Sequence, residues 1–432
     1  MRFLYQKPEL EQELAAATAV EDIEKAFAKV IDLPGDFRTP EVYGRALFAK
    51  GLDTLIPRLA RRLKLKDAPR AAKSNDNVCI LTTRIYQTGG HSRVAADLIE
   101  RLQPAGAVVM MTDVYRHLRH WQLFSQPGNQ SFLKERACVL LSSPMLVERV
   151  LEAYMILEAM RPSRIILMSH PMDIVAAIAA WPFRDVVEFV HHGDHVPSLG
   201  ATLPFSAHVD VTYTCHLACR EAGLNPAYAG MATSAVETAP PRSAAPGLRI
   251  ATCGSIHKYR GAGRHVWTDY AVAALRRPDS ELIHIGATDE AFQNEVRQAL
   301  AAAAIPAERY VFAGYQPSLP AELAKRGADV YLSSYPETGG KANLEAMMAG
   351  VPAIVPIERG LPPLVEFRLP LPRWIPVAEP ADLPGALTRA KAVGETLHTP
   401  EQAAALAREI GRFDDYAAGR PVAPTPPDDR IP

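Results

Sequence analysis

The sequence predicts an α/β protein with two doubly wound domains, each built on a parallel sheet, and an all-helical segment in front of them. Short apolar runs rich in β-branched residues alternate with helical patterns after about residue 76, and such runs are typical of strands buried on both faces of a parallel sheet. The alternation stops at a Pro- and Ser-rich stretch, 237–247, and then starts again. The length of 432 residues also exceeds that of one ordinary domain.

Residues 1–75 are expected to form the helical appendage and a linker. Thr18 and Glu21 have the spacing of a capping box in front of apolar residues at helical spacing. Thr39, followed by a proline, is expected to begin a second helix. The basic, Ala-rich stretch 64–77 is typical of a linker. The appendage either recognises an acceptor or a partner, or covers an edge of the first sheet.

The two doubly wound domains are expected at residues 76–236 and 248–419. The strands expected in the first domain are VCIL (78–81), AVVMM (107–111), CVLL (138–141), RIILMS (164–169), VVEFV (186–190) and VDVTY (209–213). Those expected in the second domain are LRIAT (248–252), LIHIG (282–286), YVFAG (310–314), DVYLS (329–333) and PAIVP (352–356). The tail, residues 420–432, is too rich in proline to pack and is expected to be disordered.

The composition argues against several classes of function. The net charge is −1, with 48% hydrophobic and 22% charged residues, so no overall basic field attracts nucleic acid or a membrane surface. No apolar run approaches the roughly 18 to 20 residues of a membrane span, and the N-terminal stretch turns acidic before a signal-like core develops. We therefore expect a cytoplasmic protein that binds no nucleic acid.

The five cysteines are an odd set without CxxC spacing, so neither a disulfide framework nor a zinc site is expected. Cys215 and Cys219 lie four residues apart on a predicted helix, and His216 follows Cys215. These side chains are either metal ligands or small buried core residues. The core interpretation is favoured.

The stretch SYPETGGKANLEA (334–346) places a Gly-Gly-Lys turn between two glutamates. It is expected to follow a strand and to lead into a helix at 343–348, with Gly350 closing that helix. The turn then lies at the carboxyl end of a parallel strand, where open sheets bind ligands. The N–H groups of Gly339 and Gly340, together with the helix N-terminus, can hold a phosphate.

The two glutamates can bind the rest of such a ligand. Glu345, expected in the first helical turn, can accept two hydrogen bonds from a ribose diol, and Glu337 can reach hydroxyl groups beyond the phosphate. The alternative is that the helix dipole favours Glu345 and that Glu337 is a solvated loop charge. Phosphate, ribose and hydroxyl groups together describe a sugar nucleotide.

The run E-TGGKANL-E-AMMAGVP (337–352) resembles the E-x7-E signature of retaining glycosyltransferases with the GT-B fold, particularly glycosyltransferase family 4. The resemblance is strongest over 248–356 and weaker over 77–230. It implies two Rossmann-like domains that face a cleft, with the donor on the second domain and the acceptor on the first. It also implies that Glu337 contacts the donor sugar and Glu345 the nucleotide ribose. Gly339, Gly340 and Lys341 would then hold the diphosphate.

A second loop, within LRIATCGSIHKYRG (248–261), supports this resemblance. Family members carry a Gly-rich turn here, followed by a lysine or an arginine-lysine pair on the donor diphosphate. The resemblance therefore implies Gly254 and one of three cations, Lys258, Arg260 or Arg264. A plain surface lysine is the alternative for Lys258.

The stretch 81–102 repeats the order of strand, Gly-Gly turn and helix in the first domain. The resemblance implies that the backbone of Gly89 and Gly90 approaches the sugar or phosphates across the cleft. His91, at the start of the helix, can face the same cleft and bind the acceptor, while Arg93 either joins it or lies on a solvated face.

The segment VHHGDHVPSLG (190–200) carries three histidines and an aspartate directly after a strand. A metal site is one interpretation of this group. However, adjacent His191 and His192 point in different directions, and the resemblance implies no metal or other cofactor, so none is expected. It implies that His191 or His192 binds the donor sugar near the reacting carbon. Asp194 and His195 either bind the acceptor hydroxyl or form a loop network.

His170, which follows the run RIILMS, is a further strand-end candidate, and a core histidine is the alternative.

The expected function is transfer of a hexose-like sugar from a nucleoside diphosphate sugar to a hydroxyl acceptor, with retention of configuration. The acceptor is expected to be a saccharide, a lipid-linked compound or another hydroxyl compound of surface polysaccharide or glycoconjugate synthesis, with peripheral membrane association left open. The alternatives are sugar-nucleotide epimerisation, an inverting transfer with Asp194 or a histidine as base, and a non-catalytic sugar-nucleotide binder. The sequence names neither the base nor the sugar.

Overall fold

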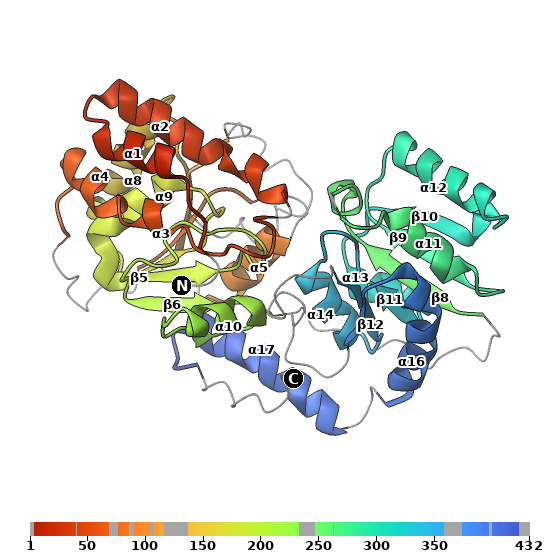
Figure 1. Cartoon of the computed structure of the whole chain (residues 1–432). Coiled ribbons are helices and arrows are strands. Elements are labelled where there is room, and N and C mark those ends of the chain that lie inside the picture. Colours follow the sequence, from red (N-terminus) through yellow and green to blue (C-terminus); the bar gives the residue numbers. More distant parts are fainter. Residues whose placement is uncertain are drawn as a thin grey trace. The chain divides into compact units, whose positions relative to one another are not determined.

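The structure is a computed structural model, and the chain folds into two compact units (Figure 1). The first contains Met1–Gln87, His91–Gly230 and Arg412–Pro432, and the second contains Thr88–Gly90 and Met231–Gly411. The residues that the structure describes are 4–39, 41–68, 77–85, 90–102, 107–115, 137–232, 247–261, 263–357, 374–396 and 400–422. Most of the expected linker at 64–77, all of the expected domain boundary at 237–247 except its last residue, and most of the tail at 420–432 lie outside these residues.

The first unit is built on a seven-stranded sheet in the order β3-β2-β1-β4-β5-β6-β7, with all neighbours parallel. Its strands are β1 (Val78–Thr82), β2 (Ala107–Met111), β3 (Ala137–Leu140), β4 (Arg164–Leu167), β5 (Val187–His191), β6 (Ala207–Asp210) and β7 (Ala227–Tyr228). Its helices after residue 76 are α5 (Gly90–Arg101), α8 (Leu146–Met160), α9 (Ile174–Ala180), η2 (Trp181–Val186), α10 (Tyr213–Glu221) and, from Arg412 on, the last part of α17 (Pro400–Ala417). The six expected strands are present, and β7, only two residues long, was not predicted.

The strand expected at 209–213 ends earlier, at Asp210, because the next residues begin a helix. Thr212 is the N-cap of α10, and its side chain accepts a hydrogen bond from Cys215 N at 3.2 Å. A threonine in this position favours helix initiation over continuation of a strand.

The second unit is built on a six-stranded parallel sheet in the order β10-β9-β8-β11-β12-β13. Its strands are β8 (Arg249–Cys253), β9 (Glu281–Ile285), β10 (Tyr310–Gly314), β11 (Val330–Leu332), β12 (Ala353–Pro356) and β13 (Trp374–Val377). Its helices are η3 (Ile256–Tyr259), α11 (Trp267–Leu275), α12 (Glu290–Ala302), η4 (Ala307–Arg309), α13 (Leu319–Arg326), α14 (Gly340–Met348), η5 (Pro380–Asp382) and α16 (Leu383–Thr396). The five expected strands are present, and β13 is the addition. Both parallel sheets are thus confirmed.

The N-terminal helices are present, but two predictions about their boundaries were wrong. They are α1 (Pro8–Ala16), α2 (Val20–Asp32), η1 (Leu33–Arg38), α3 (Lys50–Asp53) and α4 (Ile56–Arg62). The N-cap of α2 is Ala19, which makes no side-chain capping bond, so the expected capping box of Thr18 and Glu21 does not form. The helix expected after Thr39 is replaced by turns at 41–45, because these residues fold against the loop after β5.

The N-terminal helices belong to the first unit and pack on α8 and α9 (Figure 1). Two carboxylates fix them there. Glu24 on α2 accepts from the amides of Leu146 and Val147 at the start of α8, at 2.8 and 2.9 Å. Asp53 at the end of α3 accepts from Gly200 N at 2.6 Å, and from the amide and hydroxyl of Thr202 at 2.9 and 2.7 Å. The appendage is therefore an integral layer of this unit.

The end of the described chain also belongs to the first unit, although the sequence placed residues up to 419 with the second domain. Arg101 on α5 binds Asp414 on α17 at 2.7 Å. Arg164 on β4 donates to the carbonyl oxygens of Tyr416 and Ala417, at 2.9 and 3.3 Å, while also binding Glu188 at 2.8 Å. Among the residues described, no helix combines the length and apolar character that crossing a membrane requires.

We predict that Asp53→Ala lowers the free energy of unfolding by about 2 to 4 kcal/mol, because buried amides then lose their charged acceptor. The side chain of Asp53 is only 1% exposed, so water cannot replace it fully. Thermal and denaturant unfolding measure the change. The control is Glu21→Ala, which removes an exposed carboxylate from α2 and should alter stability by less than about 0.5 kcal/mol. Equal stability of the two variants would contradict the role given to Asp53.

Candidate functional site

The Gly-Gly-Lys turn follows β11 and leads directly into α14. Gly339 is the N-cap residue of α14, and Asn343 N donates to its carbonyl oxygen at 2.9 Å. The helix begins at Gly340, earlier than the predicted start at 343, so Glu345 lies in the second turn and not in the first. The N–H groups of the first turn, which have no partner within the helix, therefore come directly after Gly339.

The side chain of Lys258 reaches this turn from the loop that follows β8. A Cβ atom placed on Gly339 would lie 3.1 Å from Lys258 Nζ, so the ammonium group occupies the space that a side chain there would need. The carbonyl oxygen of Lys258 also accepts from Glu337 N at 3.3 Å, which ties η3 to the turn. A cation beside a helix N-terminus is a suitable site for an anion.

The other two candidate cations make ion pairs elsewhere. Arg260 lies 3.1 Å from Asp289 and 3.8 Å from Glu295, the first before α12 and the second on it. Arg264 pairs with Glu379. Of the three cations that the sequence left open, Lys258 is thus the one beside Gly339.

Glu337 lies in the turn itself, with a side chain that is 16% exposed. Its Oε2 is 3.8 Å from His257 Nε2, and its carbonyl oxygen accepts from Ser334 Oγ at 2.7 Å. The backbone of the turn is therefore held from both sides, by Ser334 and by the loop that carries Lys258. The carboxylate of Glu337 keeps a route to solvent, as contact with a ligand requires.

Lys341 lies inside the unit and not at the surface of the turn. Its side chain is 7% exposed, its ammonium group donates to the carbonyl oxygen of Ala232, and it lies 3.8 Å from Glu345 Oε1. This position does not support the expected contact of Lys341 with a diphosphate. It gives the lysine a different task, which is to hold the carboxylate of Glu345.

Glu345 and Lys258 act electrostatically on one thiol, that of Cys253 at the end of β8. Burial raises the pKa of Cys253 to about 12, Lys258 opposes this rise, and Glu345 adds to it. The charged groups of Lys258 and Glu345 therefore both lie close to the end of β8. The Glu345 side chain is 15% exposed, so its carboxylate is accessible to a ligand from one side.

Two glycines let the loop after β8 approach the neighbouring strand. Gly254 N donates to Ile285 O at 3.1 Å. The next residue of the neighbouring loop, Gly286, has a φ of +150°, and a Cβ there would lie 2.2 Å from Gly254 O. Sequence reasoning named Gly254 but missed Gly286, although a glycine at the end of the run LIHIG is a usable signal of close backbone approach.

Three histidines gather in the first unit, from the ends of β4 and β5 and the start of α5. The rings of His91 and His192 lie 4.4 Å apart, and their Nε2 atoms bond the carbonyl oxygens of Met168 and Ser169, at 3.1 and 2.7 Å. Burial lowers the pKa of both histidines, and in His192 the lowering is large. These are neutral imidazoles that can donate or accept hydrogen bonds.

His170 is the third histidine of this group. Its Nδ1 lies 2.7 Å from Tyr115 Oη, and burial, assisted by His91, lowers its pKa to about 4. Its amide donates to Thr83 Oγ1 at 2.7 Å.

Asp173 holds the strand ends beneath this group, and sequence reasoning missed it. It caps α9 by accepting from Ala176 N at 2.9 Å, and its other oxygen accepts from Thr83 and Thr112, each at 2.5 Å. An aspartate immediately before the apolar run IVAAIAA is the signal that could have identified it.

His191 points away from this group, into the core. Its side chain has no exposed surface and lies 3.5 Å from Asp210 on the neighbouring strand. The alternation of side chains along β5 places His191 and His192 on opposite faces. His191 therefore cannot contact a donor sugar in this structure, which corrects its expected catalytic role.

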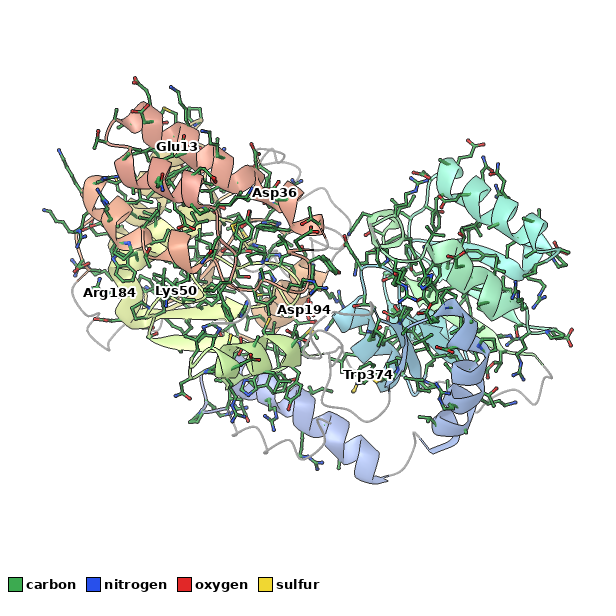
Figure 2. The ribbon with its side chains drawn as sticks, viewed as in Figure 1. Glu13, Asp36, Lys50, Arg184, Asp194 and Trp374 are labelled. Atoms are coloured by element: carbon green, nitrogen blue, oxygen red, sulfur yellow. The ribbon has the colours of Figure 1, made fainter. Side chains whose placement is uncertain are left out.

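The other first-domain candidates are dispersed. Asp194, labelled in Figure 2, bonds His195 Nδ1 at 2.6 Å, and the ring of His195 lies 5.2 Å from that of Tyr43. Asp194 and His195 thus form a network with the N-terminal segment. A loop network was one of the two interpretations that the sequence left open for this pair, and contact with the acceptor was the other. Gly90 begins α5, and a Cβ there would meet nothing within 4 Å. Gly89 lies outside the described residues.

Comparisons with known proteins identify the fold. No protein-family model and no curated protein sequence match the chain. Solved structures do match it, and three of these are a lipopolysaccharide outer core galactosyltransferase, WaaB, an Anabaena protein, HepE, in complex with UDP and glucose, and a glycosyltransferase from Rickettsia africae. Their TM-scores are 0.51, 0.54 and 0.53 at 14%, 14% and 10% sequence identity.

Each match covers 79% of this chain and nearly all of the other, 95%, 98% and 96% respectively. The similarity therefore extends over both sheets. The chain has the fold of GT-B glycosyltransferases, as the sequence predicted.

We predict that His170→Gln makes stability less sensitive to acid. The pKa of His170 is lower in the folded than in the unfolded chain, so the unfolded chain takes up the proton first, and stability falls as pH drops from about 6.5 toward 4. Between pH 7 and pH 5 the wild type should lose about 2 kcal/mol more than the variant. Unfolding at both pH values measures this. His257→Gln, at a 51% exposed histidine, is the control, and an unchanged pH slope in His170→Gln would contradict the assignment.

Proposed function

We propose that this protein is a glycosyltransferase that moves a sugar from a nucleoside diphosphate sugar to a hydroxyl acceptor. The observation that carries the proposal is the position of Lys258 Nζ beside Gly339, at the N-terminus of α14 and between two partly exposed glutamates. The fold comparisons support it, since one similar structure is a galactosyltransferase and another was determined with UDP and glucose. From the E-x7-E spacing we also propose that the chain is related to glycosyltransferase family 4.

The diphosphate binds at the turn. The N–H groups after Gly339 donate to its oxygens, and Lys258 supplies the positive charge that stabilises the nucleoside diphosphate as it leaves. Because both are fixed before the ligand arrives, little reorganisation is needed during the reaction. No metal is needed to bind this leaving group.

The two glutamates have different tasks in this proposal. Glu345, held by Lys341, accepts hydrogen bonds from the ribose hydroxyls. Glu337, on the other side of the turn, orients the donor sugar. The binding energy thus comes largely from Glu345, and the correct orientation of the reacting carbon from Glu337.

The transfer is proposed to retain the anomeric configuration. The acceptor hydroxyl attacks the anomeric carbon on the face from which the phosphate departs, the bond from that carbon to the phosphate oxygen breaks, and the departing phosphate takes the hydroxyl proton. His192, a neutral imidazole, is assigned the hydrogen bond to the donor sugar near the reacting carbon. Asp194 and His195 are proposed to contact the acceptor, together with His91.

The acceptor is proposed to be a saccharide, a lipid-linked compound or another hydroxyl compound of surface polysaccharide or glycoconjugate synthesis. We propose that the reaction takes place in the cytoplasm, with the inner face of the membrane as the site for a lipid-linked acceptor.

A thermal-shift series with UDP-, GDP-, ADP- and TDP-sugars identifies the donor, because a ligand of the folded state raises its melting temperature. NMR of that donor without acceptor separates transfer from epimerisation, since conversion of the free donor to its epimer would overturn the proposal.

We predict that Lys258→Ala weakens binding of the cognate nucleoside diphosphate by about 10- to 100-fold, the value of a charged hydrogen bond of about 1.5 to 3 kcal/mol. Isothermal titration calorimetry measures the affinity. The matched control is Arg260→Ala, two residues along the same loop, whose side chain pairs with Asp289. It should change affinity by less than about twofold. If Arg260→Ala instead bound the nucleoside diphosphate more weakly than Lys258→Ala, the assignment of the phosphate to Lys258 would be wrong.

We predict that the two glutamates affect different steps, Glu345 the binding of the nucleotide and Glu337 the turnover. Glu345→Ala should weaken nucleotide binding by about 1 to 3 kcal/mol, because it removes the ribose acceptor. Glu337→Gln should leave nucleotide affinity within about twofold and lower turnover by about 100-fold or more, because it disturbs the sugar and not the nucleotide. Calorimetry and steady-state rates with the identified donor measure the two effects. A fully active Glu337→Gln variant removes this residue from the site.

A further inference from the structure

Four side chains with metal-ligand atoms meet in the first unit, where β5, β6 and α10 come together. His191 ends β5, His208 and Asp210 lie on β6, and Cys219 lies on α10. The parallel register pairs His191 with Asp210. His208 and Asp210 are two residues apart on one strand and therefore share a face. The fold thus brings together residues that are up to 28 positions apart in the sequence.

Five of the six distances between the four ligand atoms lie between 3.1 and 3.5 Å, and the sixth, between the two imidazole nitrogens, is at most 4.8 Å. His191 Nδ1 is 3.4 Å from Cys219 Sγ and 3.5 Å from Asp210 Oδ1. His208 Nε2 is 3.1 Å from Asp210 Oδ1 and 3.3 Å from Cys219 Sγ. Cys219 Sγ is 3.5 Å from Asp210 Oδ1, and all four atoms lie within 4.8 Å of one another. A tetrahedral zinc ion with bonds of about 2.0 to 2.3 Å needs ligand atoms roughly 3.3 to 3.7 Å apart.

Hydrogen bonds alone do not compensate the buried carboxylate of Asp210 well, because its contacts are concentrated on one of its two oxygens. Two imidazole nitrogens and a thiol converge on Oδ1 of Asp210. The other oxygen, Oδ2, is buried without a hydrogen-bond partner among the described residues, as are both ring nitrogens of His216. The nearest polar group that the structure gives for Oδ2 is His216 Nδ1, at 3.6 Å, which is too long for a hydrogen bond, and an incompletely compensated carboxylate with no exposed surface is costly. A cation at the centre of the four atoms would compensate the charge directly.

We propose that His191, His208, Asp210 and Cys219 bind one zinc ion. Imidazole, carboxylate and thiolate are ordinary zinc ligands, and a thiolate disfavours magnesium and calcium. Binding forms a bond from zinc to Cys219 Sγ, and the thiol proton is released to solvent. Three of the four side chains have no exposed surface and that of His208 is 12% exposed, so the site is closed and structural.

His216 serves this site from outside the ligand set. Its Nδ1 lies 3.6 Å from Asp210 Oδ2, the oxygen that faces away from the other ligands, and a small shift would complete a hydrogen bond. The rings of Phe48 and Phe189, 6.0 and 5.9 Å from that of His191, set the orientation of His191. The ion would join β5, β6 and α10, and so hold the loop that starts at His192.

The test uses the full chain, stripped with a strong chelator and titrated with Zn²⁺ or Co²⁺. We expect about one tightly bound ion per chain, measured by elemental analysis after gel filtration. With Co²⁺ the wild type should show the visible bands of tetrahedral cobalt and the near-ultraviolet charge-transfer band of a thiolate ligand. Cys219→Ala should lose the thiolate band and bind Zn²⁺ at least about 100-fold more weakly.

The matched control is Cys215→Ala, which removes an equally buried thiol from the same helix, one turn away. It should keep both the stoichiometry and the thiolate band. Cys219→Ser, which conserves volume, and His208→Gln, at the partly exposed ligand, cover the case in which Cys219→Ala fails to fold. The proposal is overturned if the stripped wild type takes up no Zn²⁺, or if the cobalt spectrum is unchanged in folded Cys219→Ser. It is equally overturned if Cys215→Ala loses the thiolate band while Cys219→Ala keeps it.

Discussion

The candidate site of the second unit depends on the approach of the Lys258 ammonium group to the backbone at Gly339. Two conditions make this approach possible. Residue 339 has no side chain, and the carbonyl oxygen of Lys258 accepts from Glu337 N, so the two loops are held in register. With the cation fixed beside the helix N-terminus, Glu337 and Glu345 lie on either side of the anion site that we propose, one in the turn before α14 and the other in its second turn. Without that contact, Glu337 and Glu345 would be two unrelated acidic residues.

The first unit is organised by carboxylates that are buried or half-buried. Glu24 binds amides at the start of α8, Asp53 holds the loop at 200–202, and Asp173 caps α9 and binds two strand ends. Each accepts from two or more donors, which compensates the water that a carboxylate loses when it is removed from solvent. Through Asp53 and the contacts of Tyr43 and Gly44, the N-terminal segment supports the loop that carries Asp194 and His195. The appendage therefore helps to shape the candidate acceptor loop.

The sequence predicted both sheets because strands buried on two faces leave long apolar runs. It missed β7 and β13, since Ala227–Tyr228 is too short to show a pattern and Trp374–Val377 carries a proline. It placed the Gly-Gly-Lys turn after a strand correctly, but began the next helix too late, because propensity alone does not show that Gly339 can act as an N-cap.

The candidate site residues were harder to predict than the sheets. Alternation along a strand shows that His191 and His192 face opposite ways, but not which of them faces the core. The choice among Lys258, Arg260 and Arg264 depended on ion pairs with residues distant in the sequence. The proposed zinc ligands were not predictable for the same reason. His191 belongs to the histidine-rich segment 190–200 and Cys219 to the cysteine pair on α10, and the sequence gives no sign that these two meet. His208 and Asp210 belong to neither group.

The return of α17 to the first unit has a consequence for synthesis. Arg101 and Arg164 find partners at Asp414, Tyr416 and Ala417, which are translated only after the second unit. The sheet of the first unit can assemble early, but part of its surface stays uncovered until the whole second unit has been translated. The first unit is thus completed only after the second unit has been translated, and a chain that terminates before α17 would leave Arg101 and Arg164 without these partners.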